Sequence, residues 1–344
     1  MRRLSGRIVV ANILLTQRCV RSCPYCFAEK HMSESAPDDV MSWENLIYLA
    51  DFLQVAGERR FSILGGEPTL HPHFNDMVVY LLERNFNVFV FTSGIMSDRV
   101  LEEAASLFNH LPFERLSFMC NLNDPAKTRT SLAELESIKR FLKIFGGRTV
   151  PGFNIYRTDF ELEFLFHYIN EFGMHRNIRL GLTHPIVGKK NLFIPLKEVS
   201  TVINRLFSYI PMFERLRIKP GLDCGFPMCQ FKDDQLAWLY RFGGGKNEFG
   251  CGPVVDIGPD MSVWPCFPLS SFHKRSVFEF NTLKEIYDFY GDIHEKIKIE
   301  AGGIFLECDR CVFREEHLCK GGCVAHSLLH FQDEVRLRYP EVYL

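Results

Sequence analysis

The amino-acid sequence predicts an α/β fold built on parallel strands, followed by a small cysteine-rich domain. Short apolar, β-rich runs alternate with stretches of helical spacing from residue 8 to about 215. This alternation is typical of βαβ units with right-handed crossovers. After Pro220 the density of Gly, Pro and Cys rises, and eight of the 12 cysteines lie in residues 224–323. These observations indicate a boundary near residues 215–223, with few helices expected beyond it.

Six strand–helix units follow one another in the first part of the chain. The expected strands are Ile8–Leu15, Phe61–Leu64, Val88–Thr92, Leu116–Asn121, Val150–Ile155 and Ile178–Leu182. The expected helices are Trp43–Val55, Asp76–Arg84, Arg99–Phe108, Leu132–Phe145, Glu161–Phe172 and Leu196–Tyr209. Six such units form an open or partial barrel, or a doubly wound sheet, and periodicity does not choose between these architectures.

Composition excludes several classes of function. Hydrophobic residues make up 47% of the 344 residues and charged residues 24%, which is typical of a folded globular chain. The formal net charge is −2 and there is no Lys/Arg block, so nothing favours nucleic acid or an anionic membrane as a partner.

The N-terminal segment resembles a signal peptide only superficially. The basic start Met1-Arg2-Arg3 and the apolar run Ile8–Leu15 mimic its first two regions, but Asn12 interrupts that run and no small-residue cleavage site follows it. We therefore expect a buried first strand and a cytoplasmic protein. In a reducing compartment, clustered cysteines more often bind metal than form disulfides.

Three cysteines follow the first predicted strand. Cys19, Cys23 and Cys26 lie in a loop at the strand's C-terminal end, the face at which parallel α/β barrels carry their chemistry. Ordinary electron-transfer clusters use four cysteines. Three thiolates hold three irons of a [4Fe–4S] cluster, which leaves one iron for another ligand, such as the amine and carboxylate of an amino acid.

These cysteines, with Tyr25 before the third, resemble the signature of radical S-adenosylmethionine (SAM) enzymes. The second strand ends in Gly65-Gly66-Glu67-Pro68, which resembles that family's methionine-binding motif. The resemblance implies a partial (β/α)6 TIM-like barrel and a [4Fe–4S] cluster that binds SAM. It also implies reductive cleavage of SAM to methionine and a 5′-deoxyadenosyl radical that abstracts a substrate hydrogen. Family members place ribose and carboxylate contacts at strand ends, where this chain has Thr92, Ser93, Asn121 and Asn154; ordinary loop polarity is the alternative.

Eight cysteines remain after Cys120, which lies in an apolar strand and is expected to be a buried small hydrophobe. Residues 253–265 are expected to form a β-hairpin turning at Gly258-Pro259-Asp260. This hairpin brings Cys251 and Cys266 together at its open end. Two short knuckles follow, Cys308-x2-Cys311 and Cys319-x3-Cys323.

This layout resembles the SPASM domain, a C-terminal extension of radical SAM enzymes that holds two auxiliary [4Fe–4S] clusters. Met261 replaces the usual glycine of the hairpin turn, seven residues separate Cys311 from Cys319, and no cysteine follows Cys323. The resemblance divides the chain into a barrel at 1–215, a bridge at 216–250 and the cluster domain at 251–344.

Two cysteines of the bridge, Cys224 and Cys229, complete the two auxiliary sets. By analogy, one cluster is expected on Cys251, Cys266, Cys323 and one of this pair. The other is expected on Cys308, Cys311 and Cys319, with the remaining member as a candidate fourth ligand. The sequence leaves open how the pair is allocated and whether one iron site stays open. A structural zinc site on Cys308, Cys311, Cys319 and Cys323 is the alternative.

SPASM-bearing relatives usually act on polypeptides, which favours a peptide- or protein-modifying enzyme that forms a crosslink or ring in a ribosomally made peptide. Phe267 stands where sulfatase-maturing relatives have an acidic residue, and Asp256, His273 and Glu307 are expected at the surface. Eighteen residues precede Cys19, so recognition of a leader peptide is expected to need a partner protein or another surface. A flavodoxin- or ferredoxin-type donor is expected to supply electrons. The alternatives are radical chemistry on a small metabolite or cofactor precursor, and a non-catalytic iron–sulfur or zinc protein.

Overall fold

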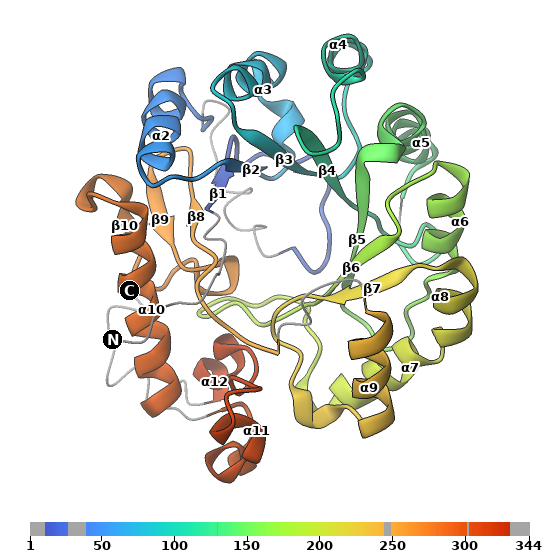
Figure 1. Ribbon diagram of the computed structural model, residues 1–344, viewed down its shortest axis with the longest axis vertical. Helices are drawn as coiled ribbons and strands as arrows, with labels where there is room; N and C mark the ends of the chain where they lie inside the picture. The colour runs from blue at the N-terminus through green and yellow to red at the C-terminus, as the bar shows by residue number, and fades with distance from the viewer. Residues whose placement is uncertain (1–10, 27–38, 129, 244–248, 301–302, 331–344) are drawn as a thin grey trace.

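A computed structural model describes residues 11–26, 39–128, 130–243, 249–300 and 303–330. In this part of the chain the strands form a single sheet with the order β10-β9-β8-β1-β2-β3-β4-β5-β6-β7. Figure 1 shows the strands curving around a centre with helices on the outside. This arrangement confirms the prediction of a parallel, barrel-like α/β fold.

Seven parallel strands make the main wall. They are β1 (Asn12–Leu14), β2 (Arg60–Leu64), β3 (Asn87–Thr92), β4 (Leu116–Asn121), β5 (Thr149–Ile155), β6 (Asn177–Leu182) and β7 (Lys219–Leu222). Each pairs in parallel with the next, as crossover helices require. The first six correspond to the predicted strands, although residues 8–10 of the first lie outside the described residues. The seventh was not predicted, because Pro220 and Gly221 lower the β-propensity of this edge strand.

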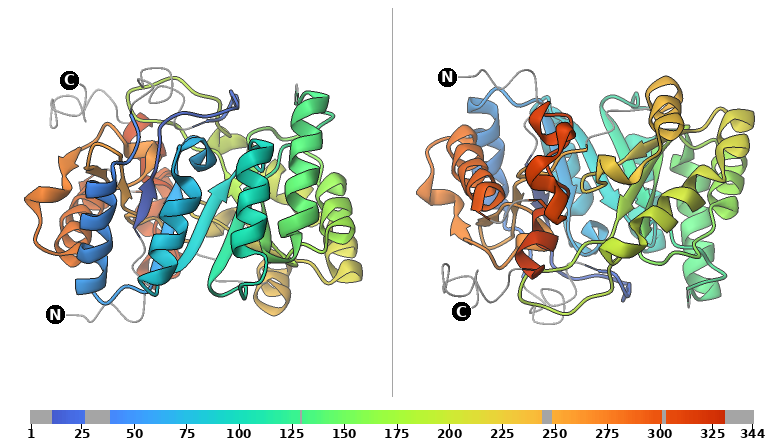
Figure 2. Two further views of the ribbon diagram at one scale, coloured as in Figure 1. Left: turned by 90° about the horizontal axis from the view of Figure 1, so that it is seen from above. Right: turned by 90° about the horizontal axis from the view of Figure 1, so that it is seen from below.

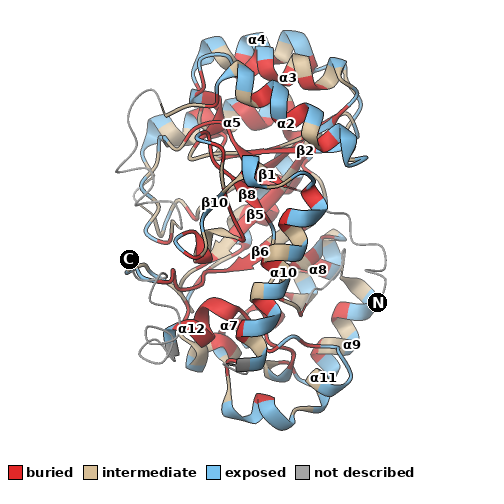
Figure 3. Ribbon diagram, turned by 90° about the vertical axis from the view of Figure 1, so that its left-hand side faces the viewer, coloured by how far each residue is buried: buried red, intermediate tan, exposed pale blue. Residues whose placement is uncertain are grey.

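Helices cover the outer face of this wall. They are α2 (Trp43–Val55), α3 (Phe74–Glu83), α4 (Asp98–Phe108), α5 (Leu132–Phe145), α6 (Glu163–Glu171), α7 (Val199–Phe207) and α8 (Ile210–Leu216). Figure 2 shows α2 to α5 side by side along the wall, and Figure 3 shows their buried residues on the side facing the strands. Both α2 and α5 have the predicted bounds. Each begins after a serine, Ser42 or Ser131, whose side chain accepts a backbone N–H of the first turn.

The C-terminal part adds three strands and four helices to the described structure. They are β8 (Asp256–Ile257), β9 (Ser262–Trp264), β10 (Arg275–Ser276), α9 (Asp233–Phe242), α10 (Leu283–Glu300), α11 (Val312–Glu315) and α12 (Val324–His330). Short 3-10 turns link many elements of the chain: Pro68–Leu70, Gly146–Arg148, Leu196–Glu198, Met228–Gln230, Phe267–Leu269, Val277–Glu279 and Leu306–Arg310. The expectation of few helices beyond residue 220 was wrong. The density of Gly, Pro and Cys in the loops hid the 18-residue helix α10.

The predicted hairpin is present as β8 and β9, with Asp256 opposite Trp264. Its turn runs from Gly258 to Met261, whose N–H donates to the Gly258 carbonyl at 3.0 Å. Met261 has a φ of 62°, the left-handed value that follows a type I turn in three-residue hairpins. That conformation explains why glycine is the usual residue here. Met261 offsets the strain by burying its side chain in the core.

The sheet runs across the boundary expected near residues 215–223. Strand β7 extends one edge of the barrel wall, and β8 joins the opposite edge by pairing in parallel with β1. The cysteine-rich part is therefore tied to the barrel by main-chain hydrogen bonds, and the three-part domain division stays a prediction. Among the described residues, no helix is both long and apolar enough to cross a membrane.

Two adjacent glycines at the start of β5 provide a test of the packing. A Cβ on Gly146 stands 2.1 Å from the Phe172 carbonyl oxygen, whereas a Cβ on Gly147 meets no atom within 4 Å. We expect Gly146→Ala to lower the free energy of unfolding by about 1–3 kcal/mol, the usual effect of overpacking. Gly147→Ala is the matched control and is expected to change it by less than about 0.5 kcal/mol. If urea denaturation gives the two variants the same free energy of unfolding, the close packing at Gly146 is contradicted.

Candidate functional site

The loop of Cys19, Cys23 and Cys26 leaves β1 at its C-terminal end. Cys26 N–H donates to the Cys23 carbonyl at 2.9 Å, and Arg21 N–H donates to the Cys19 Sγ at 3.5 Å. All three side chains are half-buried and line a single cavity of about 400 Å³. The structure thus brings the three predicted cluster ligands to one concave surface.

The Gly65-Gly66 pair lies directly against the backbone of this cysteine loop. Gly66 N–H donates to the Thr16 carbonyl at 3.0 Å, and Glu67 N–H donates to the Arg18 carbonyl at 2.7 Å. A Cβ on Gly66 stands 2.2 Å from the Arg18 carbonyl oxygen, and one on Gly65 stands 2.6 Å from that of Thr16. Both glycines also line the cavity. The first reason for glycine here is therefore contact with the cysteine loop rather than with a ligand.

Glu67 is fully buried and does not line the cavity. Its carboxylate accepts hydrogen bonds from the hydroxyls of Thr69, Thr92 and Ser93 and from the backbone N–H groups of Thr69 and Ser93, at 2.6–3.3 Å. Burial raises the pKa of Glu67, and these donated bonds oppose the rise. Glu67 therefore joins the end of β2 to the end of β3. Thr92 and Ser93, predicted as SAM contacts, line the cavity while their hydroxyls donate to Glu67.

Asn121 and Asn154 reach the same cavity from the ends of β4 and β5. The Asn121 Oδ1 atom is buried and lacks a hydrogen-bond partner, as expected of an atom that a ligand satisfies. Each asparagine lies over a glycine of the next strand: a Cβ on Gly152 stands 2.7 Å from Asn121 Oδ1, and one on Gly181 stands 3.1 Å from Asn154 Oδ1.

Tyr25 belongs to the cysteine loop; its side chain is buried and also lines the cavity. Its ring packs on Tyr156 with centroids 4.8 Å apart, its hydroxyl donates to Asn123 Oδ1, and the Asn154 amide donates to that hydroxyl. Burial and then the neighbouring charge of Cys23 raise the pKa of Tyr25. Through these contacts the aromatic residue of the cysteine motif connects the cysteine loop to the ends of β4 and β5.

Four of the later cysteines lie close to one another. Cys251 and Cys323 are hydrogen-bonded to each other, which raises the pKa of Cys251 to about 11 and lowers that of Cys323. Burial, followed by the charges of Cys251 and Cys323, raises the pKa of Cys266. Desolvation, followed by the charges of Asp223, Cys251 and Cys323, raises the pKa of half-buried Cys224. Cys224 and Cys266 line the cavity directly.

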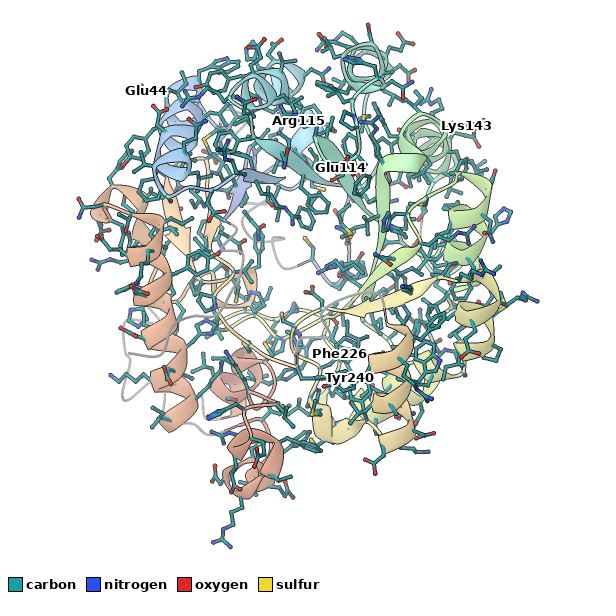
Figure 4. The ribbon with its side chains drawn as sticks, viewed as in Figure 1. Glu44, Glu114, Arg115, Lys143, Phe226 and Tyr240 are labelled. Atoms are coloured by element: carbon teal, nitrogen blue, oxygen red, sulfur yellow. The ribbon has the colours of Figure 1, made fainter. Side chains whose placement is uncertain are left out.

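Cys229 lies with the other three cysteines. Burial raises its pKa, and the charges of Cys308, Cys319 and Cys311 raise it further. Between the two bridge cysteines, Phe226 is fully buried and packs on Phe231 with ring centroids 6.2 Å apart (Figure 4). Phe226 is thus fixed in the core between the two cysteines, and Cys224 and Cys229 lie in different cysteine groups. The sequence had left this allocation open. Cys323 lies with Cys251, whereas Cys308, Cys311 and Cys319 lie with Cys229. The four cysteines of the zinc alternative are therefore divided between the two groups.

The donor chemistry of these three groups fits iron–sulfur clusters. In each group burial, and then the charge of a neighbouring cysteine, raises the pKa of at least one thiol, as at Cys19, Cys266 and Cys229; bound iron neutralises that repulsion. Cys120, by contrast, is fully buried in β4 and burial raises its pKa to about 12. This confirms its expected role as a small core residue.

Charged residues that the sequence did not point to also line the cavity. Asp256 was expected at the surface, but its side chain is 2% exposed, and it accepts a hydrogen bond from Asn12 Nδ2 at 2.8 Å. Burial raises the pKa of Asp256 to about 7. Asn12 and Asp256 are cross-strand partners in two otherwise apolar strands, and this polar pair was the signal available in the sequence. Arg179 in β6 and Asp223 directly after β7 form an ion pair that had no such signal.

The close backbone contact of Gly66 makes a direct prediction. Gly66→Ala places a Cβ 2.2 Å from a carbonyl oxygen and 2.8 Å from the Cys19 Cβ, so the cysteine loop must move. We expect the variant to fold but to lose about four Fe per chain after anaerobic reconstitution, the content of one cubane cluster. Gly291→Ala, where a Cβ meets no atom within 4 Å, is the control with unchanged iron. Full iron content in Gly66→Ala contradicts the prediction that this cysteine loop binds the cluster.

Known proteins resemble this chain in sequence. The sequence profile of the Radical SAM superfamily matches residues 13–149. The tungsten-containing aldehyde ferredoxin oxidoreductase cofactor-modifying protein of Pyrococcus furiosus is 32% identical over 299 residues, covering 82% of this chain and 77% of that protein. A probable GTP 3′,8-cyclase of Archaeoglobus fulgidus is 32% identical over 99 residues, which cover 28% of this chain and only 32% of the relative.

Solved structures share the fold at low identity. The chain named anSMEcpe, with bound AdoMet, has a TM-score of 0.64 and 16% identity, covering 97% of this chain and 98% of that one. Streptococcus suis SuiB bound to the precursor peptide SuiA has a TM-score of 0.58 and 14% identity, covering 83% of this chain and 66% of SuiB. The profile match spans the cysteine loop, and the Pyrococcus relative matches over most of both chains. The chain therefore belongs to the radical SAM superfamily and is an enzyme of the radical SAM type.

Proposed function

We propose that this radical SAM enzyme holds one SAM-binding and two auxiliary [4Fe–4S] clusters and acts on a peptide or protein. The SAM-binding cluster is assigned to Cys19, Cys23 and Cys26. One auxiliary cluster is assigned to Cys224, Cys251, Cys266 and Cys323, and the other to Cys229, Cys308, Cys311 and Cys319.

One observation carries this proposal: a single cavity is lined both by the N-terminal cysteine loop and by Cys224 and Cys266. A substrate in this cavity lies between the site of hydrogen abstraction and a group that can accept an electron. The SAM-binding cluster, when present, supplies the electron that cleaves SAM and so generates the radical. The residues of this chain seat the cysteine loop, bind the two molecules and exclude water.

The wall of the cavity suggests how its residues divide the work. Gly65, Gly66 and Asn121 lie near the cysteine loop and are assigned to SAM, together with Tyr25, Pro68, Thr92, Ser93, Asn154 and the positioning carboxylate of Glu67. Arg179, Asp223 and Asp256 are assigned to the substrate. A guanidinium and two carboxyl groups offer both donors and acceptors, which match the N–H and C=O groups of a peptide.

The fold supports a polypeptide substrate, since the structural neighbours include SuiB bound to its precursor peptide. Under this proposal the product is a crosslink or ring, a flavodoxin or ferredoxin is the electron donor, and a separate protein presents the leader peptide. A second candidate is a cofactor precursor as substrate. The identity to the cofactor-modifying protein of Pyrococcus furiosus over 82% of this chain favours that alternative.

Iron analysis tests the cluster assignment. We expect about twelve Fe and twelve sulfide per chain after anaerobic reconstitution, against about four Fe plus one Zn for the zinc alternative. Cys251→Ala/Cys323→Ala is expected to lose about four Fe, and Cys308→Ala/Cys319→Ala a separate four. Loss of about eight Fe from either double variant contradicts the division into two groups, and Cys120→Ala is the control with unchanged iron.

A mass-spectrometric assay tests the reaction and its substrate class. Reduced enzyme is incubated with SAM and with short peptides encoded beside its gene. We expect 5′-deoxyadenosine and a peptide lighter by two hydrogens per bond formed. Cys19→Ala/Cys23→Ala/Cys26→Ala is expected to release no 5′-deoxyadenosine. Release of 5′-deoxyadenosine by the wild type with every peptide unchanged contradicts the peptide proposal and favours a cofactor precursor.

A further inference from the structure

A line of hydrogen bonds crosses one wall of the cavity and ends at Cys23. Arg179 Nη1 donates to Asn154 Oδ1 at 3.0 Å, and the Asn154 amide in turn donates to the Tyr25 hydroxyl. That hydroxyl donates to Asn123 Oδ1 and also contacts the Cys23 side chain directly, and Asn123 Nδ2 donates to Cys23 Sγ at 3.6 Å. We call Arg179, Asn154, Tyr25 and Asn123 the donor chain.

Every bond in the donor chain points the same way, from a cation toward a thiol. Because Arg179 can only donate, it fixes the Asn154 oxygen toward itself and the NH2 group toward Tyr25. The Tyr25 hydroxyl then fixes the Asn123 oxygen, which leaves the Asn123 NH2 group facing Cys23. Hydrogen bonds aligned in this way polarise one another, most strongly where water is excluded.

Two further contacts hold the start of the donor chain. Arg179 Nη2 donates to the carboxylate of Asp223, which precedes Cys224. Gly181 lies opposite Asn154 on β6, where a Cβ stands 3.1 Å from Asn154 Oδ1 and 3.3 Å from Arg179 Nη2. A side chain at this position therefore crowds both partners, and glycine leaves room for the bond between them.

We propose that the donor chain sets the reduction potential of the SAM-binding cluster by holding the Asn123 amide as a hydrogen-bond donor to the Cys23 sulfur. A hydrogen bond to a cluster sulfur stabilises the more negative, reduced state and raises its potential. Asn123 and the Tyr25 hydroxyl both contact the Cys23 side chain. Asn154 and Arg179 are positioning residues that act through them. This inference rests on the proposed function, which places a cluster at Cys23.

Potentiometry of the reconstituted full chain tests the donor chain. Titanium(III) citrate sets the solution potential, and the EPR signal that changes on addition of SAM reports the cluster at Cys23. In Asn123→Leu we expect roughly a tenfold lower ratio of reduced to oxidised cluster at the same solution potential, the effect of losing one hydrogen bond to a charged group. Tyr25→Phe is expected to lower the ratio in the same direction. Tyr25→Phe keeps the aromatic ring that packs on Tyr156, so it tests the proposal even if Asn123→Leu does not fold.

Matched variants separate this effect from general disturbance. Tyr156→Phe removes a hydroxyl from the ring packed on Tyr25, outside the donor chain. Arg176→Met removes a guanidinium that bonds Leu216 and Asn170 instead. Both are expected to keep the wild-type ratio, whereas Arg179→Met is expected to lower it.

The double variant Tyr25→Phe/Asn123→Leu decides whether the two residues act as one unit. Because the Tyr25 hydroxyl contacts both Asn123 and Cys23, we expect the logarithm of the ratio to fall by less than the sum of the two single decreases. A fully additive decrease overturns the donor chain, since Tyr25 and Asn123 then act independently. An unchanged ratio in Asn123→Leu, beside a normal response to SAM, overturns the donor chain alone. A wild type without any signal that responds to SAM contradicts the proposed function instead.

Discussion

The contact between Gly65-Gly66 and the backbone of the cysteine loop is the constraint on which the rest of the site depends. Two main-chain hydrogen bonds join residues 16–18 to Gly66 and Glu67, and the missing side chains let the two backbones touch. Since Glu67 also binds the hydroxyls at the end of β3, the loop is fixed relative to two strands. The cysteines are therefore held by main-chain geometry before any metal binds, and a preorganised site of this kind reduces the ordering needed on binding.

Most of the barrel could be predicted from the sequence because local periodicity and caps dominate there. Helices α2 and α5 have the predicted bounds, since each combines an amphipathic pattern with a serine cap. The hairpin around Gly258 could be predicted from its turn residues. Strand β7 and helix α10 could not, because Pro220 and Gly221 mask the first and a loop-rich composition surrounds the second.

The cysteines and glycines of the site were predictable, but its charged residues and its arrangement were not. The cysteines and Gly65-Gly66 stand out by spacing alone. The role of Glu67 does not, because burial and the partners at the end of β3 are set by the tertiary fold. The same holds for Asp256, whose burial beside Asn12 depends on β8 pairing with β1. The burial of Phe226, between Cys224 and Cys229, is likewise set by the tertiary fold and is reported by no spacing rule.

A repeated cross-strand pairing explains how a wall of mostly apolar strands presents polar groups inward. Asn121 lies opposite Gly152, Asn154 opposite Gly181, and Arg179 opposite Gly221, in three successive strand pairs. Cross-strand neighbours on one face compete for the same space, so a glycine on one strand frees space beside the polar side chain of the other. Asn121 and Asn154 take up that space above their partners. The cavity therefore gains a continuous polar edge from β4 to β6, while the outer faces of the same strands stay packed against helices. Because each pair uses one residue from each strand, the polar edge follows from the register of the sheet, and a shift of register by one residue removes it.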